Sequence, residues 1–559
     1  MSRRTGVNGL SADLATIVRD VGSLLLIQAL MMSVSVLVAL AFREWTVALA
    51  FLTAGGLTAS VGGFVRWRFD DAPAPLMKHG MVIAAAGWFT TAVFGALPLL
   101  LAAHFTPVEA YVAFVPAGAG WEPATVLGVS SRSSLVYFRH PLHALFESMS
   151  GWTGSGLTMA VHEPSLPRAV QWWRSFIQWV GGVGVIVLTV SILARPGSGS
   201  YALYRSEARE EKIHPSIVST VRTVWKIFVA YTVLSVAVLF LAIVASPYGS
   251  RLPLWEAGWQ ALNHAMTGLS TGGFSVTDNS IGTYNSPLIE TVLLPVMTLG
   301  AIAFPIHYAV LRDRDFGRLV GDLQTKWLFV LLAAGSLLLV LQNAVFTAPG
   351  DGFGAVVEVP AALASLVSVG ELDAGRDAVF QFVSALTCTG FQSSPIGNWS
   401  DGGKLVVSVA MTLGGAAGST VGGIKIIRGY TIAKGIRWQF HRVFLPANAV
   451  VTTTIGDRTL RRDAMEREFS EAAIVSFLWV IVLLASSLLL VNVASGFSYA
   501  DALFEVASAQ GNVGLSTGIT GPTMPRLAEV MFLFNMWVGR LEIIPVLVFA
   551  RAALYGLDP

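Results

Sequence analysis

The sequence predicts an all-α integral membrane protein in which an N-terminal transmembrane hairpin precedes four parallel helix–pore-loop–helix repeats around one axis. Two observations support this fold class. The 559 residues are 54% hydrophobic and only 13% charged, with a mean hydropathy of +0.65, whereas soluble chains are about 25% charged. In addition, a glycine followed by a large apolar residue and then a small or polar one occurs four times, at nearly equal intervals of about 120 residues.

The hairpin and the repeats follow from the apolar runs. Ten runs are close to the roughly 20 residues needed to cross a bilayer. They cover residues 21–42, 46–65, 80–104, 170–194, 225–246, 288–311, 327–346, 405–424, 472–493 and 527–555. The first two form a hairpin around a very short turn, and the other eight pair up around the four glycine motifs. Each repeat therefore consists of a helix, a re-entrant half-helix, a glycine strand and a second helix.

The similarity among the repeats extends to both sides of the glycine. The glycines themselves are Gly156, Gly273, Gly390 and Gly514. Nine positions earlier stand Glu147, His264, Gln381 and Glu505. One position later stand Leu157, Phe274, Phe391 and Leu515, which we expect to point away from the axis and anchor the strand. Agreement at so many positions favours four copies of one unit over four independent glycine turns.

These repeats divide the chain into five parts. They are residues 1–78 for the N-terminal two-helix hairpin, 79–200 for the first pore repeat, 201–315 for the second, 316–430 for the third with a glycine-rich gating loop, and 431–559 for the fourth. Because each repeat crosses the membrane twice, successive repeats share one orientation and are related by an axis along the membrane normal. This arrangement favours a central pore over the inverted repeats of many secondary transporters.

Basic residues predict the orientation of the chain. Lys and Arg gather before the first repeat and in the connections between repeats, for example at Arg66, Arg205, Arg209, Lys212 and Arg312. Positively charged loops stay in the cytoplasm, so we expect a multi-pass protein of the cytoplasmic (inner) membrane with both termini in the cytoplasm. The net charge of +2 and the lack of a basic tract give no reason to expect a nucleic-acid partner.

The glycine motifs have the composition expected of a cation filter. A dehydrated monovalent cation needs several oxygens at close range, and rings of backbone carbonyls supply them. Glycine permits unusual φ angles and a close approach of the backbone to an axis, and the motifs contain no acidic side chain. We expect four segments to line the filter with their carbonyls. They are Thr153, Gly154, Ser155 and Gly156; Ser270, Thr271, Gly272 and Gly273; Thr387, Cys388, Thr389 and Gly390; and Gly511, Asn512, Val513 and Gly514.

A half-helix precedes each motif, for example at residues 142–152 and 503–510. Its C-terminal carbonyl end would face the pore and favour a cation. Glu147 and Glu505 occupy matching positions on these half-helices. They either support the filter from behind, which we favour, or act in the outer vestibule. Asp278, after the second motif, either faces that vestibule or is a simple turn residue.

A second glycine-rich segment, at the end of the apolar run 405–424, is a candidate gate. So many glycines weaken a helix by roughly 0.5–1 kcal/mol each. One interpretation is an irregular intramembrane loop beneath the filter that blocks or opens the pore, and the alternative is close helix packing through small residues. The candidate gate residues in this segment are Gly414, Gly415, Gly418, Ser419, Thr420, Gly422 and Gly423.

Arg540 lies near the middle of the last apolar run and completes the candidate gate. A charge inside the membrane is costly and is by default a functional hypothesis. The alternatives are that Arg540 snorkels from a helix end or pairs with Glu542. We interpret Lys425 and Arg428, which follow the glycine-rich segment, as anchors at the inner membrane interface and not as residues of the pathway, which is the alternative.

Two motifs give the chain a resemblance to a known family. They are GGAAGSTVGGIK at residues 414–425 and GGVG at residues 181–184. Over essentially its whole length the chain resembles the superfamily of potassium transporters that includes TrkH, KtrB and the plant HKT proteins. The N-terminal hairpin resembles the TrkH type more than the KtrB type.

The resemblance implies potassium uptake through a gated, channel-like pore, with a pseudo-fourfold pore in each subunit and potassium held by the filter carbonyls. It places Arg540 beside the gating loop, facing the pathway. It also implies a homodimer and a cytosolic ring of TrkA-like nucleotide-binding regulatory subunits. Because the chain has no Walker motif and no GxGxxG after a strand, we expect no cofactor in this chain and nucleotide control only through the partner.

Within the family, glycine in all four filters goes with potassium passage, whereas serine in the first filter goes with sodium preference in some HKT proteins. Gly156 therefore favours potassium, although Gln392 and Gly511 depart from a strictly fourfold pattern. The alternative function is a sodium- or proton-coupled potassium symporter, which charged relay residues inside several runs would favour. A membrane enzyme would need a cluster of His and carboxylates, and none is visible, so we expect no enzymatic activity.

Overall fold

The computed structural model describes residues 11–193, 216–346, 369–444, 452–456 and 458–557. In these ranges the protein is mainly helical, with two short antiparallel strand pairs. Six of the described helices are long and apolar enough to cross a membrane, and eight spans result if each of two bent helix pairs is one span. The basic residues Arg205, Arg209 and Lys212 lie outside the described residues.

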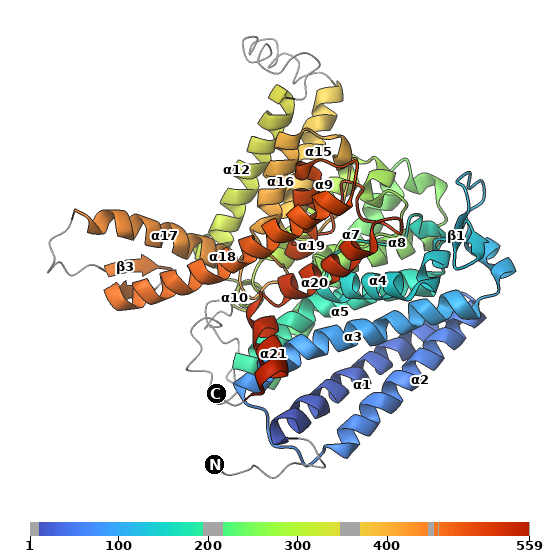
Figure 1. Ribbon diagram of the computed structural model, residues 1–559. Helices are drawn as coiled ribbons and strands as arrows, with labels where there is room; N and C mark the ends of the chain where they lie inside the picture. The colour runs from blue at the N-terminus through green and yellow to red at the C-terminus, as the bar shows by residue number, and fades with distance from the viewer. Residues whose placement is uncertain (1–10, 194–215, 347–368, 445–451, 457, 558–559) are drawn as a thin grey trace.

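The predicted N-terminal hairpin is confirmed as α1 (Ala12–Ala41) and α2 (Trp45–Arg68). The two helices lie side by side next to α3 (Met77–Phe105), as Figure 1 shows. Glycines permit this approach, because a Cβ added at Gly62 would lie 2.7 Å from the carbonyl oxygen of Gly22. Contacts between small residues are a common way to join helices in membranes.

The turn of this hairpin also contacts the first pore repeat. Helix α5 (Arg168–Leu193) begins where the Glu44 carboxylate accepts hydrogen bonds from the backbone amides of Arg168, at 2.6 Å, and Ala169, at 3.0 Å. The first amides of a helix have no partner within the helix, and a negative charge beside them is favourable. The hairpin is thus fixed to the first repeat by polar contacts as well as by packing.

Four re-entrant half-helices precede the glycine motifs. They are α4 (Pro141–Thr153), α8 (Leu254–Leu269), α15 (Val369–Leu386) and α19 (Tyr499–Gly511). With 13 residues each, α4 and α19 are about 20 Å long, which is too short for a bilayer core of about 30 Å. Both agree with the predicted half-helices.

Longer elements flank each half-helix. The preceding helices are α3, α7 (Ile217–Ala245), α12 (Leu323–Phe346) and α18 (Arg462–Val493). The following helices are α5, α9 (Pro287–Ala301), α16 (Asp401–Thr412) and α20 (Arg526–Arg540). The order of helix, half-helix, glycine strand and helix is the predicted one, and the exact boundaries between the five parts stay a prediction.

Three of the predicted runs are interrupted in the structure instead of forming one helix each. The run 288–311 forms α9 and α10 (Phe304–Asp313), bent by 106°, and the run 527–555 forms α20 and α21 (Ile544–Tyr555), bent by 112°. A proline stands in the first turn of α10 and of α21, a position where its fixed φ angle suits the start of a new helix and its missing amide hydrogen is not needed. The run 405–424 ends as a helix at Thr412, and α17 (Ile426–Arg442) begins only after the glycine-rich segment.

The remaining elements are short connections. Strand β1 (Ala124–Val126) pairs with β2 (Val129–Ser131), and β3 (Thr452–Ile455) pairs with β4 (Arg458–Arg461). The latter pair lies beside α17 and α18, which extend together to one side of the molecule in Figure 1. The other short helices are η1 (Val108–Phe114), η2 (Ser134–Arg139), η3 (Glu163–Ser165), η5 (Gly249–Arg251), η6 (Ser280–Tyr284), α11 (Gly317–Gly321) and η7 (Ile396–Asn398).

Candidate functional site

The four glycine segments share one backbone conformation. Two positions before the key glycine, φ is 68° at Gly154, 53° at Thr271, 50° at Cys388 and 55° at Asn512. At the key glycine, φ is 73° at Gly156, 74° at Gly273, 79° at Gly390 and 107° at Gly514. The residue just before each key glycine donates its backbone amide to the carbonyl five residues earlier. These hydrogen bonds are Ser155 to Ser150 at 2.9 Å, Gly272 to Thr267 at 2.8 Å, Thr389 to Ser384 at 2.8 Å and Val513 to Ser508 at 2.9 Å. The sequence motif is therefore a repeated piece of three-dimensional structure.

These segments meet in a closed ring. A Cβ added at each key glycine would crowd the carbonyl oxygen of the residue just before the key glycine of another segment. The contacts run from Gly156 to Gly272, from Gly273 to Thr389, from Gly390 to Val513 and from Gly514 back to Ser155. Glycine is needed at all four positions because φ is positive there and because the neighbouring backbone leaves no room for a side chain.

The sixteen residues predicted to line a filter all lie in this ring or directly behind it. Gly156 and Gly514 are half-buried, and the other fourteen are buried. Behind the backbone, the hydroxyls of Thr153 and Ser155 lie 2.8 Å apart, and the Asn512 amide donates to Ser155 Oγ at 2.8 Å, which joins the fourth segment to the first. Side-chain contacts behind the backbone thus hold the segments together.

A cavity of about 160 Å³ opens on the ring, and all four key glycines line it. Polar side chains from the first two repeats form part of its wall, namely Thr158, Glu163, Arg174, Ser275 and Asp278. Asp278 therefore faces the cavity, as one of its two sequence interpretations proposed. Within the described part of the chain, no group of three His, Cys, Asp or Glu residues could hold a metal ion.

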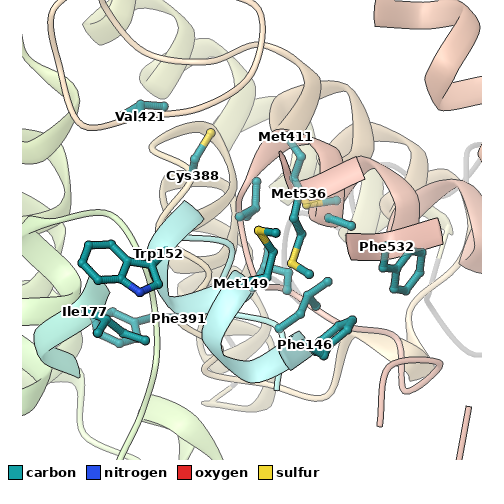
Figure 2. Close-up of a cluster of buried hydrophobic side chains, with 14 of the residues drawn as sticks. Phe146, Met149, Trp152, Ile177, Cys388, Phe391, Met411, Val421, Phe532 and Met536 are labelled. Atoms are coloured by element: carbon teal, nitrogen blue, oxygen red, sulfur yellow. The ribbon is translucent and has the colours of Figure 1, made fainter. Parts of the chain in front are cut away.

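The large apolar residue after each glycine anchors its segment, as predicted. Leu157, Phe274, Phe391 and Leu515 are at most 1% exposed. Phe274 packs at Gly151 of α4, and Phe391 packs at Gly268 of α8, so an anchor of one repeat rests on the half-helix of the repeat before it. Figure 2 shows the surrounding apolar cluster, in which Phe146 and Met149 of α4 lie near Met536 of α20.

Glu147 and Glu505 support the backbone behind the ring, which agrees with the favoured interpretation. Glu147 accepts hydrogen bonds from Thr158 Oγ1 at 2.9 Å and from the Met159 amide at 2.7 Å. Glu505 accepts them from Ser516 Oγ at 2.7 Å and from the Thr517 amide at 2.9 Å. In the second repeat the matching residue His264 contacts Ser275 Oγ at 2.9 Å.

Sequence reasoning missed Gln178 of α5. Its amide nitrogen donates to the carbonyl oxygen of Gly272 at 2.6 Å, and its amide oxygen accepts from the Phe274 amide at 3.0 Å. A helix of the first repeat thus supports the filter segment of the second. The available signal was a polar residue within an apolar run, which is costly in a membrane unless it has a partner.

Charged and polar contacts connect neighbouring repeats in a circle. In each, the helix after one glycine segment contacts the half-helix of the next repeat, and the fourth contact returns to the first repeat. The contacts are Arg168–Glu256 at 2.7 Å, Glu290–Arg376 at 3.1 Å, Lys404–Asp501 at 2.7 Å and Glu529–His143 at 2.9 Å. Because buried charges require partners, these contacts fix the order in which the repeats surround the ring.

The glycine-rich segment forms an irregular loop against the ring, so the helix-packing alternative is wrong. The Gly414 amide donates to the carbonyl of Ile424 at 2.8 Å, which closes the loop at its base. Thr420 Oγ1 lies 2.9 Å from Thr271 Oγ1 of the second filter segment. A Cβ added at Gly422 would crowd the carbonyl oxygen of Gly511 in the fourth segment. The loop therefore contacts two of the four filter segments.

Arg540 holds this loop from the side. Its Nη1 donates to the carbonyl of Thr420 at 2.8 Å, and its Nη2 donates to the carbonyl of Gly181 in α5 at 2.9 Å. The side chain is 4% exposed, so it does not snorkel. Arg540 lies beside the loop, as the resemblance implied, and connects it to the GGVG segment of the first repeat.

The prediction for Lys425 and Arg428 is wrong. Both are buried, at 6% and 2% exposed, and both approach Glu542, with Arg428 Nη1 at 2.6 Å and Lys425 Nζ at 3.6 Å. The bend between α20 and α21 brings Glu542 to them, which the sequence did not reveal. These residues fix the end of the loop inside the protein instead of anchoring it at the membrane surface.

Four pore loops that meet in one carbonyl ring, set in a frame of apolar helices, define an integral membrane protein of the pore-loop class. The sequence profile of the TrkH family, described as a cation transport protein, matches residues 79–555. The chain therefore belongs to the TrkH family of cation transport proteins.

Individual relatives agree with this assignment. A cation transporter of Methanocaldococcus jannaschii is 32% identical, with 96% of this chain and 95% of the relative covered. The Trk system potassium uptake protein TrkH of Halomonas elongata is 28% identical, with 97% and 99% covered. The crystal structure of the potassium transporter TrkH from Vibrio parahaemolyticus has the same fold, with a TM-score of 0.74, 23% identity, and 97% of this chain and 99% of that chain covered.

Proposed function

We propose that this protein mediates potassium uptake across the cytoplasmic membrane through a gated, channel-like pore selective for monovalent cations. The observation that best supports this function is the closed ring in which each key glycine lies against a carbonyl of another segment. The names of relatives such as the potassium uptake protein TrkH of Halomonas elongata support potassium as the transported ion.

The proposed filter works by replacing the water shell of the cation with backbone oxygens. Carbonyls of the four segments surround the axis, and the half-helices direct their C-terminal ends toward it, which favours a cation. Acidic side chains are absent from the motifs, so selection depends on carbonyl geometry and suits a weakly hydrated monovalent ion. The glycine at position 156 favours potassium over sodium.

The proposed gate is the loop between α16 and α17 together with Arg540. The loop lies against filter residues Thr271 and Gly511, and the two carbonyl contacts of Arg540 stabilise it there. Movement of the loop away from the ring would open the pathway. The positive charge of Arg540 adds an electrostatic barrier to cations while the loop is closed.

The proposed assembly is a homodimer in the inner membrane, with both termini in the cytoplasm and a cytosolic ring of TrkA-like regulatory subunits that bind the nucleotide. Lys78 connects the start of α1 to the end of the chain, because its Nζ lies 2.8 Å from Asp13 and 3.4 Å from the carbonyl of Leu557. This contact brings the start of α1 and the end of α21 to the same side of the protein, which supports a common cytoplasmic location of both termini. We assign no cofactor and no enzymatic step to this chain.

The experiment that tests this function is rubidium and sodium tracer flux into proteoliposomes containing the purified chain alone, driven by an imposed potassium gradient. Uptake that prefers potassium and rubidium, and whose zero-flux potential follows the potassium gradient alone, supports a passive selective pore. A zero-flux potential that shifts with the sodium or proton gradient would instead support the coupled symporter. If flux requires TrkA-like subunits and nucleotide, the gate is closed in the isolated chain.

A further inference from the structure

The cavity beside the glycine ring is lined by a carboxyl group, one oxygen of which has no hydrogen-bond partner among the described residues. Glu163, in the connection between the first glycine segment and α5, lines this cavity. Its side chain is 8% exposed, and its Oε2 has no hydrogen-bond partner among the described residues. Buried polar atoms nearly always have a partner, and an exception in a native protein indicates a missing ion, water or function.

The charges around Glu163 make the cavity negative when its carboxyl group is ionised. Arg174 of α5 is the nearby cation, and its Nε already lies 2.6 Å from Glu147 Oε1 of α4. Its Nη1 donates to the Ser275 carbonyl at 2.8 Å. Since Glu147 neutralises Arg174, Glu163 and Asp278 remain as the carboxylates on the cavity wall. Carboxylates in such a recess raise the local concentration of cations.

We propose that Glu163 is the side-chain ligand of an outer cation site, which holds an incoming monovalent cation in the cavity before it enters the glycine ring. The site belongs to the first repeat alone, because the matching positions of the other repeats are Ser280, Gly397 and Gly521. The outer entrance of the pathway is otherwise fourfold, so the cation would bind preferentially on the side of the first repeat. The inference rests on the proposed function, since it adds one step to the same pathway.

Protons compete with the cation at this site. Burial raises the pKa of Glu163 to about 8, and the repulsion of Asp278 and Glu147 acts in the same direction, against the attraction of Arg174. The carboxylate binds the cation, whereas the protonated acid does not. The apparent cation affinity therefore decreases as the external pH is lowered. Below that pKa the decrease is up to about tenfold for each pH unit. His162 lies 2.8 Å from Asp278 and therefore needs its own control.

The test compares the full-length wild type with Glu163→Gln in proteoliposomes. Rubidium uptake is measured against external potassium concentration at external pH 6 and pH 9, with internal pH fixed. We expect the half-saturating concentration of the wild type to be higher at pH 6 than at pH 9, by up to about a hundredfold for a pKa of about 8. In Glu163→Gln it should be high at both pH values, while the potassium-to-sodium preference is unchanged. Glu109→Gln, which removes an exposed acid outside the cavity, and His162→Gln should both keep the wild-type pH dependence.

A wild type without pH dependence, or a Glu163→Gln variant that keeps it, overturns the outer site. If Glu163→Gln does not yield a monodisperse protein, Glu163→Asp replaces it, and an unchanged half-saturation curve in that variant counts against the site. These outcomes differ from a failure of the proposed function, in which the wild type would show no potassium-selective flux at any pH, alone or with regulatory subunits and nucleotide.

Discussion

Arg540 gives the sharpest test of the gate, because it is a buried charged side chain that joins the loop to the first repeat. Its two hydrogen bonds, to Thr420 at 2.8 Å and Gly181 at 2.9 Å, are made by a charged donor that is 4% exposed. Hydrogen bonds to charged groups contribute about 1.5–3 kcal/mol each, so the pair contributes about 3–6 kcal/mol to the closed arrangement before the cost of burying the charge is subtracted.

Replacing Arg540 with glutamine removes the charge and shortens the side chain, so both carbonyl contacts are lost. A net loss of only about 1.4 kcal/mol changes the ratio of open to closed loop about tenfold. We therefore expect Arg540→Gln to raise rubidium uptake into proteoliposomes of the isolated chain by tenfold or more, since the electrostatic barrier disappears as well.

The matched control is Arg551→Gln, which removes an exposed arginine from α21 and should leave the flux unchanged. Size-exclusion chromatography and thermal unfolding establish that Arg540→Gln is folded. A folded Arg540→Gln protein whose flux equals or falls below that of the wild type would refute the role of Arg540 in holding the loop closed.

Three further changes follow from the same geometry. Gly156→Ser places a side chain where φ is 73° and the Gly272 carbonyl is adjacent, so the ratio of sodium to rubidium flux should rise. Gly422→Ala crowds the Gly511 carbonyl, so the loop should close less completely and basal rubidium flux should rise. Lys404→Met leaves the carboxylate of Asp501 without the partner that lies 2.7 Å away, and a lost buried pair costs about 3–5 kcal/mol, so the unfolding temperature in detergent should fall by several degrees.

Each of these changes has its own control. For Gly156→Ser, an unchanged ion preference in a folded protein would contradict the placement of Gly156 in the filter. Gly429→Ala introduces the same methyl group into α17, where the added Cβ would meet no described atom within 4 Å beyond its chain neighbours and its own helix backbone, and it should leave basal flux unaltered. Lys326→Met removes an exposed lysine, and a loss of thermal stability equal to that of Lys404→Met would argue against the inter-repeat contact.

Local features of the sequence predicted most of the ring. A short half-helix, a glycine with positive φ and a large apolar anchor after it all lie within one short stretch of consecutive residues, and all four copies adopt one conformation. The sequence also predicted that Glu147 and Glu505 support the backbone behind the ring, because both occupy the same position relative to their glycine. The prediction was strong because the motif is repeated, so that each copy could be compared with three others.

The sequence revealed the bends between α9 and α10 and between α20 and α21 only in part. Pro305 and Pro545 stand where α10 and α21 begin, yet apolar composition continues across both bends and hides them. The consequence was an error about Lys425 and Arg428, whose partner Glu542 reaches them only because α20 and α21 meet at 112°. A linear apolar run has no information about the direction of the chain after a bend.

The sequence by itself determined the membrane class, the four repeats and the residues of the ring, because apolar length, periodic recurrence and glycine conformation are local properties of the chain. Only the tertiary structure decided which repeat follows which around the axis, that Gln178 supports the second filter segment, and that Glu163 lines the cavity with an unsatisfied oxygen. These facts depend on contacts between residues many tens of positions apart, such as Gln178 with Gly272, and such contacts form only when the packing of whole helices brings the two side chains or backbones together.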